Sequence, residues 1–286
     1  MSTGAHRRIF DAHFHIGPYG KQSFERHSIR PISEALDHAD GVACQEHLTK
    51  NDLWGGVIVP TYLEDQRAAF RYNRLLIHAV SQHSALYGGL WVSPLPETED
   101  LCTEALRLLP HPKIRALKLA SNTWRPYGIN PQSWTSRIRH NVERILAAAR
   151  DHELVIHMHT GHADGADPHA FQAFMQHYGM AATYQFVHMG EAIAPMFAFV
   201  PRFVEWIERG CAVYTDTSLA PGFGPPWLLA ELDRRNLGCS RVLFATDAPW
   251  GRFAAEYAKL HAMDVSDAVR DHLFWKNAAA LYRLAE

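Results

Sequence analysis

Two histidines, His13 and His15, stand two residues apart near the start of the chain, in the sequence DAHFH at residues 11–15. Side chains alternate across a β-strand, so a strand here would place both imidazoles on one side and close together. Two neutral imidazoles on one rigid face supply two of the four or five ligands of a tetrahedral or five-coordinate zinc site. The pair is a weak signal by itself, because the chain holds 19 histidines and short motifs arise by chance.

Further ligand-type residues strengthen this signal, because they stand at the ends of three other apolar runs. They are His157 and His159, His188, and Asp247. In a barrel of parallel strands these ends converge at one mouth. Side-chain parity agrees, since His157 and His159 share one face of their run and Asp247 shares a face with Ala245. The sequence therefore predicts a cluster of imidazoles and a carboxylate at one end of a barrel.

Lys118 is the fifth residue of the apolar run Ile114–Leu119, on the same face as Ala116. That parity predicts an amine pointing into the barrel rather than at the surrounding helices. Lysine is almost never fully buried without a partner, because desolvating an ammonium group is costly. We therefore expect Lys118 to contact a substrate or a carboxylate near the cluster.

The elements that position these residues are eight short runs rich in Val, Ile, Leu, Phe and Tyr, which predict eight strands. The predicted strands are Ile9–His15, Trp54–Val59, Leu86–Val92, Ile114–Leu119, Leu154–His159, Thr183–His188, Ala212–Thr215 and Val242–Thr246. Stretches with helical periodicity lie between them, such as Leu63–His83, Glu97–Leu109, Trp134–His152, Pro168–Tyr178 and Pro225–Asn236. Three more helices are predicted at the end, over Phe253–Met263, Ser266–Leu273 and Trp275–Leu284.

This alternation implies parallel strands joined by crossover helices, and eight such units close a (β/α)₈ TIM barrel of the α/β class. The 286 residues fit one barrel, and no linker or internal repeat divides them, so we expect a single domain over residues 1–286. Two connections look long, residues 17–31 and 121–133. Both would emerge at the carboxyl ends of the strands, where such loops build active sites.

The composition of the chain limits the kinds of binding partner that we expect. The formal net charge is −2 and no long run of Lys or Arg occurs, so nucleic acid is not an expected partner. No apolar segment approaches the roughly 18 residues of a membrane span, and none near the first residue resembles a signal peptide, which predicts a cytoplasmic protein. The four cysteines are far apart and are expected to be reduced. We expect a small-molecule substrate, and a homo-oligomer is compatible with the sequence.

Four motifs follow one another at the predicted strand ends: DAHFH (11–15), VIHMHTG (155–161), FVHMG (186–190) and LFATDAPW (243–250). Together they resemble the motif set of the amidohydrolase superfamily, most closely its amidohydrolase-2 branch of TIM-barrel metal-dependent hydrolases. The resemblance covers nearly the whole chain, from Phe10 to the sequence FWKNAA at residues 274–279.

The resemblance implies one divalent metal held by four side chains: His13, His15, one histidine of the fifth strand, and Asp247. His159 is the expected fifth-strand ligand, because Thr160 and Gly161 follow it as small residues follow the family's histidine. His157 is the second choice, as a residue behind the ligands or one packed in the barrel. Zinc is the expected metal, and manganese or iron would suit the same ligands.

Binuclear members of the superfamily carry a carboxylated lysine on the fourth strand, which bridges two metals. The amidohydrolase-2 branch resembles a mononuclear design. We therefore expect an unmodified Lys118 and one metal, with a carboxylated Lys118 and two metals as the alternative.

The implied reaction is hydrolysis of a carbonyl-centred bond, such as that of an amide, lactone or cyclic imide, by a metal-activated water. Asp247 would accept the proton of that water and pass it to the leaving group, while His188 would orient the attacked oxygen. Relatives in the branch decarboxylate aromatic or muconate-type acids without oxidation, which is the alternative. A third hypothesis, a noncatalytic ligand-binding barrel, would be favoured by loss of Asp247 or His188, yet both are present.

The expected substrate contacts are Lys118, Arg125, Trp91 and Trp250, because a cation suits an acidic substrate and aromatic rings suit a flat one. Five further aromatic or basic residues near the predicted mouth are weaker candidates: Phe14, Tyr19, Trp124, Tyr127 and His162. Apart from Lys118, none of these residues has a diagnostic spacing, and for each of them packing in the core or at the surface is an alternative at least as strong as substrate contact. Asp216, after the seventh strand, is similarly open.

Overall fold

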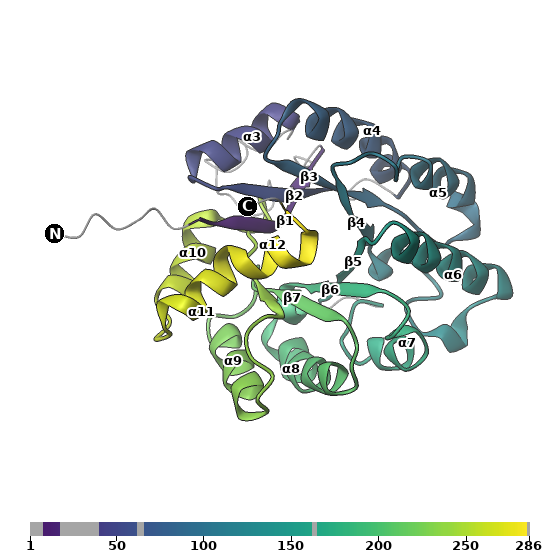
Figure 1. The fold of residues 1–286 in the computed structure, drawn as a ribbon. Coiled ribbons are helices and arrows are strands. Elements are labelled where there is room, and N and C mark those ends of the chain that lie inside the picture. Colours follow the sequence, from purple (N-terminus) through teal and green to yellow (C-terminus); the bar gives the residue numbers. More distant parts are fainter. Residues whose placement is uncertain (1–7, 18–39, 62–65, 162–164, 285–286) are drawn as a thin grey trace, which may run out of the picture.

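The computed structural model of this chain describes residues 8–17, 40–61, 66–161 and 165–284. Eight parallel strands follow one another in a single sheet in the order of the sequence, and Figure 1 shows helices around their ring. The strands are β1 (Phe10–Ile16), β2 (Gly55–Pro60), β3 (Leu86–Trp91), β4 (Ile114–Leu119), β5 (Val155–His159), β6 (Thr183–Val187), β7 (Val213–Asp216) and β8 (Val242–Leu243). The predicted (β/α)₈ TIM barrel is confirmed.

The α-helices of the described residues connect these strands. They are α3 (Gly41–Lys50), α4 (Gln66–Gln82), α5 (Glu99–Leu106), α6 (Ser136–Asp151), α7 (Phe171–Tyr178), α8 (Ile193–Glu208), α9 (Gly224–Arg234), α10 (Phe253–His261), α11 (Asp267–Asp271) and α12 (Asn277–Tyr282). Side chains cap some of them, as the Asp40 carboxylate does by accepting from the Ala43 N–H at 2.9 Å, which satisfies an end group of α3. Neither α3 nor α8 was among the helices named from the sequence.

The eighth strand is the main correction to the predicted elements. The sequence predicted Val242–Thr246, but β8 ends at Leu243. The chain then runs beside β1 in an irregular conformation, in which the Ala12 N–H donates to the Phe244 carbonyl at 3.0 Å and the Asp247 N–H donates to the His13 carbonyl at 2.9 Å. Asp247 has a φ of 54°, which no strand residue adopts. The predicted strand end at Thr246 is therefore replaced by an irregular segment that leads to Asp247.

The interior of the barrel has an apolar layer at the amino-terminal ends of the strands. It is formed by Phe10, Ala12, Val57, Ala116, Val155, Leu243, Ala245 and Tyr282, with further residues around α12. A second and larger apolar cluster fills the space between the strands and the surrounding helices. The apolar layer inside the barrel supports the polar residues that follow it along each strand.

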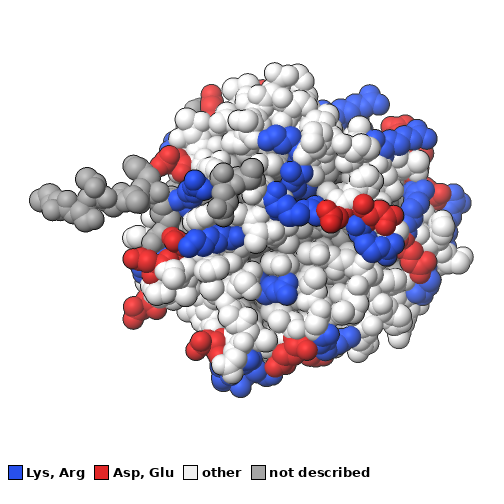
Figure 2. All heavy atoms as spheres, in the orientation of Figure 1, with Lys and Arg blue, Asp and Glu red and all other residues white. Residues whose placement is uncertain are grey.

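Aromatic rings and cations cover the same end of the barrel. Arg8 lies 5.3 Å from the ring centroids of both Trp54 and Trp275, and Lys113 lies 4.3 Å from that of Tyr87, within the range of cation–π contacts. Figure 2 shows Lys and Arg side chains around the middle of one face and both signs of charge along its rim. No helix of the described residues has the length and hydropathy needed to cross a membrane.

Candidate metal centre

His13 and His15 lie on the inner face of β1, with ring centroids 4.9 Å apart. The predicted alternation is confirmed here, since Phe14 between them packs outward against His47 of α3, with ring centroids 4.9 Å apart. Both imidazoles approach the same carboxylate oxygen. Asp247 Oδ1 is 2.9 Å from His15 Nε2 and 3.4 Å from His13 Nε2.

His188 reaches the same oxygen from the end of β6. It begins the short 3₁₀ turn His188–Gly190, and its Nε2 lies 3.8 Å from Asp247 Oδ1. Candidate ligand atoms of His13, His188 and Asp247 all lie within 4.8 Å of one another. Both His188 (φ 76°) and Asp247 (φ 54°) hold left-handed backbone conformations, which cost energy in non-glycine residues and are typical of functional sites.

Asp11 fixes the segment that carries Asp247. Its carboxylate accepts from the Thr246 N–H at 2.9 Å and from the Thr246 hydroxyl at 2.5 Å, and it lies 3.0 Å from His47 Nε2. The first residue of the DAHFH motif therefore holds the strained backbone next to Asp247 against β1. The motif includes Asp11 without indicating this role, and no sequence pattern assigns a role to His47 or Thr246.

Burial dominates the electrostatics of the cluster. Desolvation, with Lys118 as the next largest cause, lowers the pKa of His13 well below its usual value, and burial likewise lowers the pKa of His15 and His188. Burial raises the pKa of Asp247 well above its usual value, although the nearby Lys118 opposes this. Neutral imidazoles and a carboxylate that lacks water suit a divalent cation, which would stabilise the ionised carboxylate. The residues present therefore fit a single divalent metal.

Lys118 points into the barrel as predicted and is fully buried. Its Nζ lies 3.5 Å from His13 Nε2, and burial lowers its pKa to about 8. The carboxylate of Asp247 pairs with histidines instead, which leaves the amine without an ion pair to a carboxylate among the residues that the structure describes. Its neighbour in the register of β3 and β4 is Trp91.

The two histidines of β5 have different surroundings. Both ring nitrogens of His157 have partners inside the barrel, since its Nδ1 lies 3.3 Å from His13 Nδ1 and its Nε2 lies 2.8 Å from the Tyr282 hydroxyl. His159, one pleat further along, is partly exposed and its ring centroid is 5.2 Å from that of His188. His159 stays the predicted ligand, and the structure adds His188 to the candidate ligands.

The predicted substrate contacts divide into three groups. Trp250 lies edge-on against His15, with ring centroids 4.6 Å apart at 87°, so it lines the cluster. Trp91 is fully buried in the outer core. Arg125 is exposed and lines a separate cavity of about 460 Å³ with residues of the 121–130 loop. Among the weaker candidates, Trp124 packs against Trp134 in the core, Tyr127 lines the Arg125 cavity, and Tyr19 and His162 lie outside the described residues.

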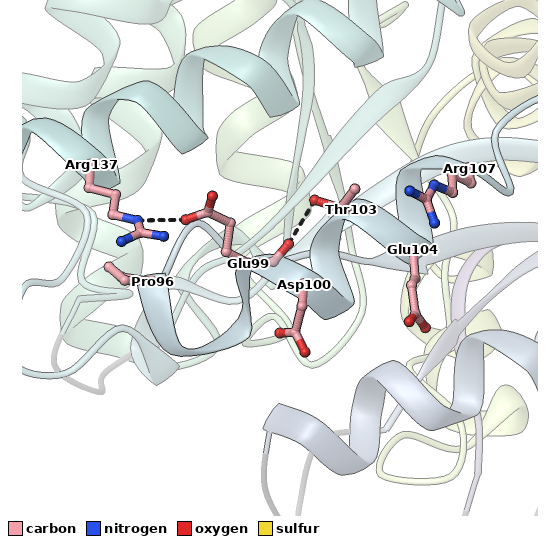
Figure 3. A pocket seen from close by; sticks show the side chains of 7 residues that line it. All are labelled: Pro96, Glu99, Asp100, Thr103, Glu104, Arg107 and Arg137. Carbon is pink, nitrogen blue, oxygen red and sulfur yellow. Dashed lines mark hydrogen bonds and ion pairs between the residues drawn. The ribbon is translucent and has the colours of Figure 1, made fainter.

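A further cavity of about 550 Å³ lies at α5, away from the cluster. Figure 3 shows that Glu99, on its wall, already pairs with Arg137, at 2.7 Å, and accepts at its carbonyl from Thr103. The other charged groups on its wall, Asp100, Glu104 and Arg107, are exposed, so none of them is a buried charge comparable to Lys118.

Four buried polar residues beneath the cluster are its least predictable part. They are Gln185 of β6, Asp216 of β7, Ser218 after it, and Tyr282 of α12. Only Asp216 was singled out in the sequence, without a role. Tyr282 and Gln185 stand within ordinary helix and strand patterns, and nothing in their sequence neighbourhood signals contact with His157 or Asp216.

The amidohydrolase family model matches residues 11–284. The chain belongs to the amidohydrolase family. This confirms the resemblance and the predicted class, a metal-dependent hydrolase of the superfamily or a decarboxylase of the same branch. No curated protein sequence matches it significantly.

Solved structures similar to this amidohydrolase share its fold at low identity. A 2,6-dihydroxybenzoate decarboxylase bound to 2,6-dihydroxybenzoate has a TM-score of 0.70 and 14% identity, over 97% of this chain and 98% of that one. A 5-carboxyvanillate decarboxylase from Novosphingobium aromaticivorans with bound manganese has a TM-score of 0.67 and 13% identity, over 98% of each chain. An amidohydrolase from Burkholderia multivorans has a TM-score of 0.65 and 14% identity, over 97% of this chain and 100% of that one.

Proposed function

We propose that this amidohydrolase is a metal-dependent decarboxylase that removes CO₂ from an aromatic acid without oxidation. The observation that carries the proposal is the buried amine of Lys118, which lies 3.5 Å from His13 Nε2. A buried ammonium group is costly unless an anion accompanies it. A substrate carboxylate or phenolate would supply that anion next to the metal ligands. Two similar structures, a 2,6-dihydroxybenzoate decarboxylase and a 5-carboxyvanillate decarboxylase, support the same class.

Each side chain has a role that its surroundings suit. The Lys118 ammonium holds an acidic group of the substrate, and the ring of Trp250 beside His15 gives a flat substrate an apolar contact. Asp247, whose Oδ1 lies within 4 Å of three imidazoles, relays a proton to the substrate. When the carbon–carbon bond breaks, its electron pair stays on the ring carbon, which takes this proton as CO₂ leaves. Removal of water from the cluster strengthens all of these interactions.

The metal would be held by His13, His15, His159 and Asp247, with His188 beside it or as a further ligand. A bound divalent cation supplies a Lewis acid, which stabilises negative charge on a substrate oxygen. Zinc stays the prediction from imidazole chemistry, and the manganese in a similar structure makes manganese the first alternative to load. Lys118 is expected to be unmodified and the site mononuclear. The cytoplasmic location and a homo-oligomer also stay predictions.

Hydrolysis, which the sequence favoured, is the second candidate, because one similar structure is an amidohydrolase and Asp247 next to three imidazoles also suits a base for a bound water. The test is a panel of hydroxybenzoates and other aromatic carboxylates alongside lactones and cyclic amides, with the protein loaded with zinc or with manganese. Asp247→Asn is the inactive control, and Asp151→Asn at the exposed end of α6 is the matched active one.

We expect CO₂ release from at least one aromatic acid, lost in Asp247→Asn and retained in Asp151→Asn. Turnover of a lactone or amide that depends on Asp247, without CO₂ release from any acid, would replace the proposal with hydrolysis. Intact-mass measurement of the loaded protein checks Lys118 separately, since carboxylation adds the mass of CO₂.

A further inference from the structure

Two chains of buried hydrogen bonds start from the carboxylate of Asp216 and end at two of the candidate metal ligands. The shorter chain runs through Ser218. Its hydroxyl lies 2.5 Å from Asp216 Oδ1, and His188 Nδ1 lies 2.8 Å from that hydroxyl. The backbone N–H groups of Ser218 and His188 also donate to Asp216 Oδ1, at 3.1 and 3.3 Å.

The longer chain leaves from the other oxygen of Asp216. Gln185 Nε2 donates to Asp216 Oδ2 at 2.8 Å, and the hydroxyl of Tyr282 contacts the Gln185 side-chain carbonyl. The same hydroxyl lies 2.8 Å from His157 Nε2, and His157 Nδ1 lies 3.3 Å from His13 Nδ1. Every side chain in both chains is at most 2% exposed, so water does not compete for these bonds.

The direction of each bond in the shorter chain follows from the carboxylate. An ionised carboxylate only accepts hydrogen bonds, so the single hydroxyl proton of Ser218 goes to Asp216. The Ser218 oxygen must then accept from His188, which places the ring proton of His188 on Nδ1. A neutral imidazole carries one ring proton, so His188 Nε2, the atom that faces Asp247 at 3.8 Å, keeps its lone pair.

The same reasoning gives the direction of each hydrogen bond in the longer chain of bonds. The amide nitrogen of Gln185 must face the carboxylate, so its carbonyl accepts the hydroxyl proton of Tyr282. The Tyr282 oxygen then accepts from His157 Nε2–H, which leaves the Nδ1 of His157 as an acceptor. His13 must donate to it from Nδ1, and His13 Nε2 keeps its lone pair. The Lys118 ammonium, which can only donate, agrees with this because it lies 3.5 Å from that same Nε2.

We infer that Asp216 is a positioning residue which, through Ser218 on one side and through Gln185, Tyr282 and His157 on the other, holds His188 and His13 in the tautomer whose Nε2 lone pair faces the metal position. The inference rests on the proposed metal centre. Metal-ligating histidines need their second nitrogen fixed by a partner, and such partners raise metal affinity. Here one carboxylate sets the tautomers of two ligands. Tyr282 of α12 takes part in one of the two hydrogen-bond chains, from the amino-terminal side of the barrel.

The two chains can be cut separately. Tyr282→Phe breaks only the link to His157 and His13, and Ser218→Ala breaks only the link to His188. Asp216→Asn replaces one acceptor with a donor, so at least one chain must reverse its direction. Tyr184→Phe is the matched control, because Tyr184 is equally buried but its hydroxyl donates to the Tyr178 carbonyl at 2.6 Å, outside both chains.

Two measurements test the inference, neither of which depends on catalysis. Nitrogen NMR shifts of histidine rings in the metal-free protein report which nitrogen carries the proton, and chelator competition reports metal affinity. We expect Nδ1–H at both His13 and His188 in the wild type. Tyr282→Phe should lose that tautomer preference at His13 alone and Ser218→Ala at His188 alone, each with metal affinity lowered about 10- to 100-fold. Tyr184→Phe should match the wild type.

Nε2–H at His13 or His188 in the wild-type protein would overturn the inference even if every variant failed to fold. Wild-type metal affinity in both Tyr282→Phe and Ser218→Ala would also overturn it, while the metal centre would stand if His13→Ala still lost the metal. If instead His13→Ala retained full metal affinity, the proposed centre itself would be wrong.

Discussion

The interior of this barrel has two layers that are equally buried and opposite in chemistry. The lower layer, at the amino-terminal ends of the strands, is apolar and includes Phe10, Val57, Ala116, Val155 and Leu243. The upper layer, at the carboxyl ends, is polar and includes His13, Lys118, His157, His188 and Asp247. The two layers come from the same strands, a few residues apart.

The two layers show that this barrel keeps the residues that stabilise its fold apart from the residues that form its site. Burial of the lower layer removes apolar surface from water and stabilises the fold. Burial of the upper layer works against folding, because desolvation shifts the pKa of every histidine in it downward and that of Asp247 upward. In TIM barrels the carboxyl-terminal face carries catalysis. Changes in the upper layer should therefore affect activity, and changes in the lower layer should affect stability.

The largest effect is expected from Asp247→Asn. Loss of the proton carrier and metal ligand should lower kcat/KM by about 100- to 10,000-fold, while the metal-free protein unfolds at the same temperature or higher, because a buried carboxylate is removed. Steady-state kinetics and thermal unfolding of the metal-free protein check both halves. Full activity, or a large drop in the unfolding temperature, would contradict the division between the layers.

Leu243→Ala, in the lower layer, should lower the stability of the fold and leave activity unchanged. Leu243 is fully buried in the inner cluster, so the cavity left by its side chain should lower the free energy of unfolding by about 2 to 5 kcal/mol. The folded fraction should keep its metal affinity and kcat, since no ligand is touched. Denaturant unfolding and metal titration measure the two quantities, and a selective loss of metal affinity would show that the layers are coupled.

Lys118→Met sharpens the comparison, because it makes one upper-layer position apolar. Removal of a charged partner should weaken binding of an acidic substrate by about 2 kcal/mol, roughly 30-fold in KM. The substrate-free protein should be as stable or more stable, since burial of the amine no longer opposes folding. An unchanged KM together with reduced stability would assign Lys118 to the framework.

The smallest effect is the pH dependence of the metal-free fold. The pKa values of His13, His15, His157 and His188 lie well below their usual value, so between the two values the unfolded chain binds protons that the folded chain does not. The contribution of these four histidines to the free energy of unfolding is therefore fully present above about pH 6.5, and it is lost as the pH falls below that value. The raised pKa values of Asp216, Asp247 and Glu256 act in the opposite direction, but they are three groups against four.

We therefore expect the free energy of unfolding to fall by roughly 1 kcal/mol or more per pH unit below about pH 6.5, as measured by denaturant titration of metal-free protein. Leu243→Ala should lower the whole curve without changing its slope, because it removes no titratable group. A curve that stays flat or rises on acidification would show that the histidines are not held neutral by burial.

By itself the sequence determined the barrel and the residues that face its interior. Strand periodicity placed His13 and His15 on one face and Lys118 toward the centre, because side-chain alternation is a local property of the backbone. Four motifs in register identified the superfamily, which family membership confirmed. The reaction was less determined: hydrolysis was the expectation from the motifs, and decarboxylation, named as the alternative, is the reaction that we propose.

Only the tertiary structure decided what surrounds each of these residues. The Asp11 carboxylate holds the segment after β8 by accepting from Thr246, 235 residues away in the sequence, and the partners of His157 include Tyr282, 125 residues away. The full burial of Trp91 and the approach of His188 to Asp247 likewise depend on packing between strands. No local pattern encodes contacts of this kind, because they exist only once the barrel has closed and brought the ends of its strands together.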